Sequence, residues 1–187
     1  GGGGGGGGVL PLARGARVAL LGDACDSRFL SAWERRWDAA DYYTVGGSGR
    51  VIAHPDRAYS IRRGLEERRA AGELGAIHFY GQNDARASLA AMRGFDVGIV
   101  CGGARAAEGG DRSSLKLDQH DYMVTLSALV ADARRGGDTS MPPLVAVALA
   151  PGAILTDWAA DASAAVLAFL PGQEAGRALA DVLLGSV

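Results

Sequence analysis

The chain has 187 residues, of which 48% are hydrophobic and 21% charged, a balance too apolar for a disordered protein. No stretch of the sequence approaches the roughly 20 apolar residues of a membrane-spanning helix, so we expect no membrane partner. The net charge of -2, from 19 basic and 21 acidic residues, gives no general attraction to nucleic acid.

Eight consecutive glycines open the sequence, and no packed core can use such a run. We interpret residues 1–9 as a glycine-rich disordered linker or a remnant, and residues 10–187 as one domain. About 180 residues are enough to bury a substantial core and too few for two ordinary enzyme domains. No signal-peptide pattern precedes Val9, and the compartment stays unknown from the residues alone.

Short apolar runs recur along the chain, and helical patterns separate most of them. Runs of this kind are typical of buried strands, and their alternation with helices predicts an α/β domain. We expect a mostly parallel open sheet flanked by helices, that is, a three-layer α/β sandwich. The predicted strands are Arg17–Leu21, Ala76–Tyr80, Val97–Cys101, Leu144–Ala148 and Ala164–Phe169.

Apolar residues at helical spacing predict the helices between these strands. Asp118 and Asp121 are placed to supply an N-cap and a first-turn acid for the clearest of them. In the last helix we expect Ala175, Ala178, Leu179, Val182 and Leu183 to face inward. The predicted helices are Ser60–Ala71, Ala85–Met92, Gln119–Ala133 and Glu174–Leu184.

The segment Asp26–Asp41 carries Phe29, Leu30, Trp33 and Trp37 at helical spacing. This spacing predicts a fifth helix, and its high charge density predicts that the helix is exposed or only partly docked. Tryptophan at helical spacing with apolar neighbours is usually a core residue, so we expect Trp33 and Trp37 to be buried.

Cysteine and histidine side chains do not form a pattern typical of a metal site. Cys25 and Cys101 lie far apart in sequence without CxxC spacing, which indicates neither a zinc site nor a disulfide framework. The three histidines, His54, His78 and His120, lie in different elements without i, i+4 spacing. We therefore expect no metal and no cofactor.

The segment Gly102–Leu117 has no periodicity and directly follows the strand Val97–Cys101. Loops at the carboxyl ends of parallel strands meet at one edge of the sheet, where ligands bind. Within this segment Glu108 stands beside two glycines, so a substrate could approach its carboxyl group closely. A raised pKa would let Glu108 act as an acid; the alternative is a solvated polar loop. Asp111 and Arg112 fit a structural role.

A second glycine-rich loop, Gly46–Arg50, has the sequence GGSGR. Backbone N–H groups of such a loop can bind a phosphate or bring the main chain close to a sugar. The loop does not fit the dinucleotide fingerprint, because Val51 and Ile52 stand where the last glycine is needed. A nucleotide site is thus the weaker interpretation.

The order of these motifs resembles the C-terminal α/β sandwich domain of family 3 glycoside hydrolases, the β-glucosidase-type enzymes. The motifs are RVALLGD, GGSGRV, DVGIVCGG, EGGDRSSLKL and FLPGQEAGRALADVLLG, in this order along the chain. The resemblance covers nearly all of Leu10–Gly185, and the PGQEAG…ADVLLG match is its most specific part.

The resemblance implies a hydrolase that acts on terminal β-linked glucose or a similar sugar by a retaining mechanism. In the family, an aspartate of a preceding (β/α)8 barrel is the nucleophile, and a glutamate of the sandwich domain is the acid/base. Glu108 matches that glutamate. The resemblance also places Gly47, Ser48, Gly49, Arg50, Asp111 and Arg112 at or near the substrate. Secretion is suggested by the family only.

Two features depart from the family pattern. The chain stops at Val187, where the family typically continues into an NPSGKLP-like segment, and Asp118 stands where the family often has proline. We expect a domain truncated at its C-terminus, with the barrel absent, which does not catalyse hydrolysis alone. The alternatives are a non-catalytic carbohydrate-binding module and, with less support, a nucleotide-binding domain.

Overall fold

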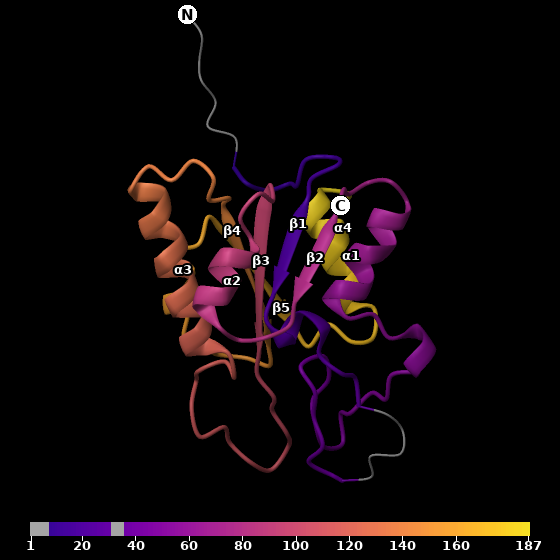
Figure 1. The fold of residues 1–187 in the computed structure, drawn as a ribbon. Coiled ribbons are helices and arrows are strands. Elements are labelled where there is room, and N and C mark those ends of the chain that lie inside the picture. Colours follow the sequence, from indigo (N-terminus) through magenta and orange to yellow (C-terminus); the bar gives the residue numbers. More distant parts are fainter. Residues whose placement is uncertain (1–7, 31–35) are drawn as a thin grey trace, which may run out of the picture.

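The structure is a computed structural model and describes residues 8–30 and 36–187. In this part of the chain five strands form one sheet in the order β2-β1-β3-β4-β5, and every neighbouring pair is parallel (Figure 1). The predicted α/β class and parallel sheet are thus confirmed. The strands are β1 (Val18–Leu21), β2 (Ile77–Tyr80), β3 (Val97–Gly103), β4 (Leu144–Ala150) and β5 (Ala164–Phe169).

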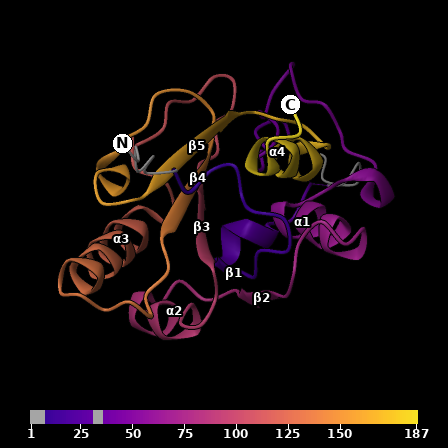
Figure 2. The ribbon, with the colours of Figure 1, turned by 90° about the horizontal axis from the view of Figure 1, so that it is seen from above.

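Helices cover both faces of the sheet and make three layers, as Figure 2 shows, with α1 and α4 on one face and α2 and α3 on the other. The α-helices of the described residues are α1 (Ile61–Ala70), α2 (Ala85–Ala91), α3 (His120–Arg135) and α4 (Ala175–Leu184). Short 3-10 helices are η1 (Asp23–Asp26), η2 (Pro55–Arg57) and η3 (Asp157–Ala159).

The two central strands, β3 and β4, are buried at every position. Alternate residues of β4 point to opposite faces: Val145 and Val147 belong to the core cluster that includes residues of α1 and α4, and Ala146 and Ala148 to the cluster that includes residues of α3. Burial on both faces explains why these strands are continuous apolar runs without polar alternation. The core therefore lies on both sides of the sheet.

The helices α1 and α4 pack backbone to backbone at two glycines. A Cβ on Gly64 would lie 2.1 Å from the Gly176 carbonyl oxygen, and a Cβ on Gly176 would lie 1.9 Å from the Ser60 carbonyl oxygen. Ala175, Leu179 and Leu183 of α4 are buried, as predicted. The predictions for Ala178 and Val182 were wrong, because both side chains are exposed. Gly176 and Ala180 are buried in their place.

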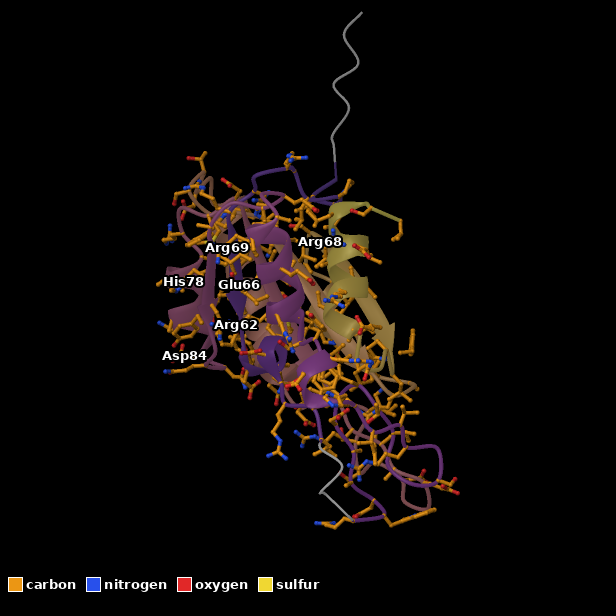
Figure 3. All side chains as sticks on the ribbon, turned by 90° about the vertical axis from the view of Figure 1, so that its right-hand side faces the viewer. Arg62, Glu66, Arg68, Arg69, His78 and Asp84 are labelled. Atoms are coloured by element: carbon orange, nitrogen blue, oxygen red, sulfur yellow. A yellow bond between two sulfur atoms is a disulfide. The ribbon has the colours of Figure 1, made fainter. Side chains whose placement is uncertain are left out.

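The charged side of α1 faces outward, with Arg62, Glu66 and Arg69 labelled in Figure 3. Arg69 forms an i, i+3 ion pair with Glu66, and Arg68 forms an ion pair with Asp181 of α4. Both ion pairs involve partly exposed side chains at the helix surface. No helix in residues 8–30 and 36–187 is long and apolar enough to span a membrane.

The predicted helix Asp26–Asp41 is wrong in the part that the structure describes. Asp26 ends η1, and residues 27–30 and 36–41 form no helix; residues 31–35, with Trp33, lie outside the described residues. Trp37 is 61% exposed and is not a core residue. The reason lies in Asp41, whose carboxylate accepts the N–H of Leu30 at 2.9 Å and fixes a loop there.

The sequence indicated no disulfide, but Cys25 and Cys101 form one, with Cα atoms 5.1 Å apart. The pairing follows from topology. Strands β1 and β3 are parallel neighbours with Leu21 beside Val100, and η1 turns the chain after β1 so that Cys25 lies over the carboxyl end of β3. Separation in sequence is therefore no guide to separation in this sheet.

Asp118 was predicted to cap α3, but Gln119 takes the N-cap position and no side chain caps the helix. Asp118 instead accepts a hydrogen bond from the Tyr42 hydroxyl at 2.8 Å. The predicted first-turn acid, Asp121, is confirmed. The side chain of Asp118 thus joins α3 to the segment that precedes the glycine-rich loop.

Candidate active site

The two loops that the sequence singled out lie side by side beyond the carboxyl ends of β1 and β3 (Figure 1). The N–H of Gly46 donates to the carbonyl of Ala106 at 3.0 Å, and the N–H of Glu108 donates to the carbonyl of Gly46 at 2.9 Å. Gly46 and Ala107 are paired as a short parallel bridge. Backbone hydrogen bonds therefore hold Gly46–Arg50 against the loop that carries Glu108.

The side chain of Ser48 binds the carboxylate of Glu108. Its hydroxyl donates to Glu108 Oε2 at 2.5 Å, and its backbone N–H donates to the same oxygen at 2.7 Å. Both residues are exposed. These two donors, the hydroxyl first, lower the pKa of Glu108 below its ordinary value. Glu108 is therefore an anion at neutral pH in this chain.

The pKa of Glu108 is shifted in the direction opposite to the one that a general acid requires. A general acid needs a pKa raised by burial or by a nearby negative charge. The described residues provide neither for Glu108, since the side chain is exposed and its hydrogen-bond partners are donors of Ser48. The chain holds the carboxyl group in place but leaves it in its basic form.

The remaining residues of the glycine-rich loop have different structural roles. Gly47 has φ +105° and leaves no room for a side chain, because a Cβ there would lie 2.4 Å from the Cβ of Glu108. The carbonyl of Gly47 accepts the N–H of Arg50 at 3.1 Å, which closes the turn. A Cβ on Gly49 would make only an ordinary 3.6 Å contact with Val45.

Asp111 and Arg112 line a groove of about 840 Å³, whereas Glu108 and Ser48 do not line it. The guanidinium of Arg112 donates to the carbonyl oxygens of Ala153 at 3.1 Å and Lys116 at 2.8 Å. Arg112 thus anchors the loop to its neighbour after β4, a structural role. The groove has mixed charge, with Arg28, Arg36, Asp38, Asp41, Arg105, Asp111 and Arg112 in its lining.

Sequence reasoning missed Asp41, which shapes the segment before the glycine-rich loop. The side chain is buried, and its carboxylate accepts the backbone N–H groups of Tyr43 at 2.8 Å and Thr44 at 2.7 Å. An aspartate that binds N–H groups two and three residues ahead is a common turn former. The local sequence DYYT ahead of GGSG was the available signal.

A buried polar network around Tyr42 and Gln119 was also missed. Gln119 Nε2 donates to the Tyr42 hydroxyl at 3.0 Å and to Asp23 Oδ1 at 2.9 Å, and Gln119 Oε1 accepts the N–H of Gly103 at 2.9 Å. Burial raises the pKa of Tyr42 to about 12. The network ties the segment before GGSG to β3 and α3, and no sequence pattern reports it.

Metal-binding side chains do not gather in the part of the chain that the structure describes. There, no group of three or more His, Cys, Asp or Glu side chains is placed to hold a metal ion. His54 and His78 are exposed, and the buried His120 has its Nε2 3.3 Å from Asp157 Oδ2. The contact of His120 does not involve Glu108 or Ser48.

Residues 6–187 match the family model described as the glycosyl hydrolase family 3 C-terminal domain. The chain belongs to this family. The match covers nearly the whole sequence and confirms the resemblance inferred from the motif order. No curated protein matches the chain.

Solved structures of β-glucosidases share the fold of this family 3 domain. The β-D-glucoside glucohydrolase of Trichoderma reesei has a TM-score of 0.73 and 23% identity over 96% of this chain. The Chaetomium thermophilum β-glucosidase has a TM-score of 0.73 and 20% identity over 95% of this chain. For β-glucosidase 3B of Thermotoga neapolitana, in complex with glucose, the values are 0.69, 20% and 95%.

The family 3 domain corresponds to about a quarter of each of those proteins. It covers 26% of the Trichoderma and Thermotoga chains and 22% of the Chaetomium chain. Full-length proteins of this kind therefore contain at least one further domain. At these identities the likeness establishes the fold alone.

Proposed function

We propose that this domain supplies the general acid/base to a β-glucosidase-like retaining glycosidase, and that Glu108 is that residue. The observation that supports the proposal is the backbone pairing of the two loops, which fixes Glu108 beside Ser48 at the carboxyl edge of the sheet. Ligands of open α/β domains bind at this edge. The substrate is a terminal β-D-glucosyl residue or a similar sugar.

A retaining glycosidase needs two carboxyl groups about 5 to 5.5 Å apart. One attacks the anomeric carbon; the other protonates the leaving oxygen and then, as a base, removes a proton from the attacking water. Glu108 is proposed for the second role, and an aspartate on a (β/α)8 barrel domain for the first. The two domains would form one cleft, so the chain alone is expected to be inactive.

The anionic state of Glu108 in this chain fits a cleft that the barrel completes. A nucleophile carboxylate placed near Glu108, together with burial by the barrel and the sugar, would raise the Glu108 pKa. The raised pKa would give the protonated acid that the first step requires. When the nucleophile becomes esterified to the sugar its charge disappears, the Glu108 pKa falls, and the anion can act as base.

The other proposed substrate contacts come from the same two loops. Gly47, Ser48, Gly49 and Arg50 would border the sugar from the glycine-rich loop, and Asp111 and Arg112 from the loop that carries Glu108; of these six residues, Asp111 and Arg112 line the groove. Arg112 has both terminal nitrogens bound to carbonyl oxygens, so its contribution would be to hold the loop shape.

The coding sequence upstream of Gly1 tests the proposal directly. It is expected to encode a (β/α)8 barrel with an aspartate at the carboxyl end of one strand. An upstream sequence of an unrelated fold would contradict the proposal. With the barrel joined to this chain we expect hydrolysis of an aryl β-glucoside, and with this chain alone we expect none.

A carbohydrate-binding module without catalysis is the second candidate function, and the groove of about 840 Å³ is the observation that favours it. Saturable binding of glucose to the chain alone, measured by titration calorimetry or NMR, would support it. A nucleotide site at Gly46–Gly49 receives less support, because the Ser48 N–H already binds a carboxylate. Absence of a thermal shift with nucleotide would remove that alternative.

A further inference from the structure

The two donors of Ser48 bind only one of the two carboxylate oxygens of Glu108. Oε2 accepts the hydroxyl at 2.5 Å and the backbone N–H at 2.7 Å. Among residues 8–30 and 36–187 no group donates a hydrogen bond to Oε1. The carboxylate is thus fixed asymmetrically, with one oxygen held by the loop and the other open to a ligand.

We propose that Ser48 is a positioning residue for Glu108, which makes Oε1 the oxygen that carries and transfers the proton. This inference rests on the proposed acid/base role of Glu108. A carboxylate oxygen that already accepts two hydrogen bonds is the poorer place for a proton, because the added proton would repel both donors. The protonated form therefore keeps Oε2 bound to Ser48 and carries its hydrogen on Oε1.

The backbone on the N-terminal side of Ser48 holds the Glu108 side chain next to Ser48. Gly46 accepts the N–H of Glu108, and the close approach of Gly47 to the Glu108 Cβ restricts the side chain to one side of the loop. Ser48 thus orients the acid/base carboxyl group and leaves its open oxygen to the leaving group and to water. This positioning role is additional to the place beside the sugar that is proposed for Ser48.

An NMR titration of the carboxyl groups of this chain tests the hydrogen bonds themselves. The chain has six glutamates, which makes individual assignment feasible. Ser48→Ala is expected to move the Glu108 midpoint to higher pH, and Ser48→Thr, which keeps the hydroxyl, is expected to restore it. An unchanged Glu108 midpoint in Ser48→Ala would overturn the inference.

Two controls come from the same molecule. Glu67, whose pKa is lowered by a hydrogen bond from Arg177, should titrate identically in every Ser48 variant. Ser140 makes the same pair of contacts elsewhere: its N–H and hydroxyl both donate to Asp138 Oδ1, at 3.0 and 2.6 Å. Ser140→Ala should therefore raise the Asp138 midpoint and leave Glu108 unchanged.

The pH profile of kcat/KM, measured on the chain joined to its barrel, separates positioning from sugar binding. If Ser48 positions the acid, Ser48→Ala moves the alkaline limb to higher pH and Ser48→Thr reverses the move. An unmoved alkaline limb in Ser48→Ala, with or without a higher KM, would overturn the inference. If Glu108→Gln leaves hydrolysis unchanged, the acid/base role itself fails, whatever the titration shows.

Discussion

The backbone of Gly47 lies directly against Glu108: a Cβ on Gly47 would come within 2.4 Å of the Glu108 Cβ and 2.8 Å of its Oε2. The Cβ of Glu108 is close to the main chain and cannot move without the loop. Gly47→Ala is therefore expected to push the two loops apart and to break the Ser48 contact. The Glu108 midpoint in an NMR titration should then rise.

Gly152→Ala is the matched control for that variant, because a Cβ on Gly152 would meet no atom within 4 Å. Its Glu108 midpoint should equal that of the unchanged protein. An unchanged Glu108 midpoint in Gly47→Ala as well would show that the loops adapt without losing the hydrogen bonds.

The contact between α1 and α4 predicts a large effect from a single methyl group. Gly64→Ala or Gly176→Ala would place a Cβ about 2 Å from backbone carbonyl oxygens, which a flexible side chain cannot relieve. Overpacking of this kind typically costs about 1–3 kcal/mol, and backbone contacts favour the upper end. Urea denaturation of both variants measures the loss, and equal stability to Gly152→Ala would refute the packing argument.

The disulfide predicts a dependence of stability on reductant. Cys25 and Cys101 are 76 residues apart; a disulfide typically stabilises a folded domain by about 2–4 kcal/mol, and a loop of this length favours the upper end of that range. A double change to alanine, or reduction, should lower the urea midpoint accordingly. Peptide mapping without reductant should recover the two cysteines in one linked peptide, and separate peptides would contradict the pairing.

Tyrosine ionisation gives a test at alkaline pH. Burial raises the pKa of Tyr42 to about 12 from an ordinary value of about 10, so the folded protein holds this proton more tightly than the unfolded one. The contribution to stability is complete below pH 10 and is lost as the pH rises through 12. Phenolate absorbance in Tyr42→Phe should lose part of its step near pH 12, where Tyr122 also titrates.

If Tyr42→Phe instead reduces the phenolate absorbance step near pH 10, Tyr42 titrates as an ordinary tyrosine, and this result would contradict the buried network. The same variant removes the hydroxyl that donates to Asp118 and accepts from Gln119, so it should also lower the urea midpoint at neutral pH. Far-ultraviolet circular dichroism checks that the variant remains folded.

Much of this fold could be predicted from the sequence because its strands are buried on both faces. A strand such as β4 is then a continuous apolar run, and the helix patterns between the strands mark a parallel sheet. The segment Asp26–Asp41 was misjudged because apolar spacing alone does not reveal that Asp41 binds backbone N–H groups and fixes a loop. The hydrogen bonds of Asp41 outweigh the helical spacing of the apolar residues in this segment.

The candidate site was predictable in its location and not in its chemistry. The position of both glycine-rich loops at the carboxyl edge follows from strand order, which the sequence pattern supports. The contact of Ser48 with Glu108 and the disulfide of Cys25 with Cys101 depend on how segments that follow different strands are placed against each other at the edge of the sheet. Both are contacts between residues far apart in sequence, and no local sequence pattern predicts them.

The central claim is tested most directly in the Glu108→Ala variant of this chain joined to its barrel. The measurement compares the rates at which the variant hydrolyses glucosides with poor and with good leaving groups. Loss of a general acid should slow hydrolysis of a glucoside with a poor leaving group by about 10²–10⁴-fold. A strongly activated aryl glucoside needs no protonation, so its first step should be nearly unaffected. Equal rates for Glu108→Ala and the unchanged enzyme, or an equal loss with both substrates, would contradict the acid/base role of Glu108.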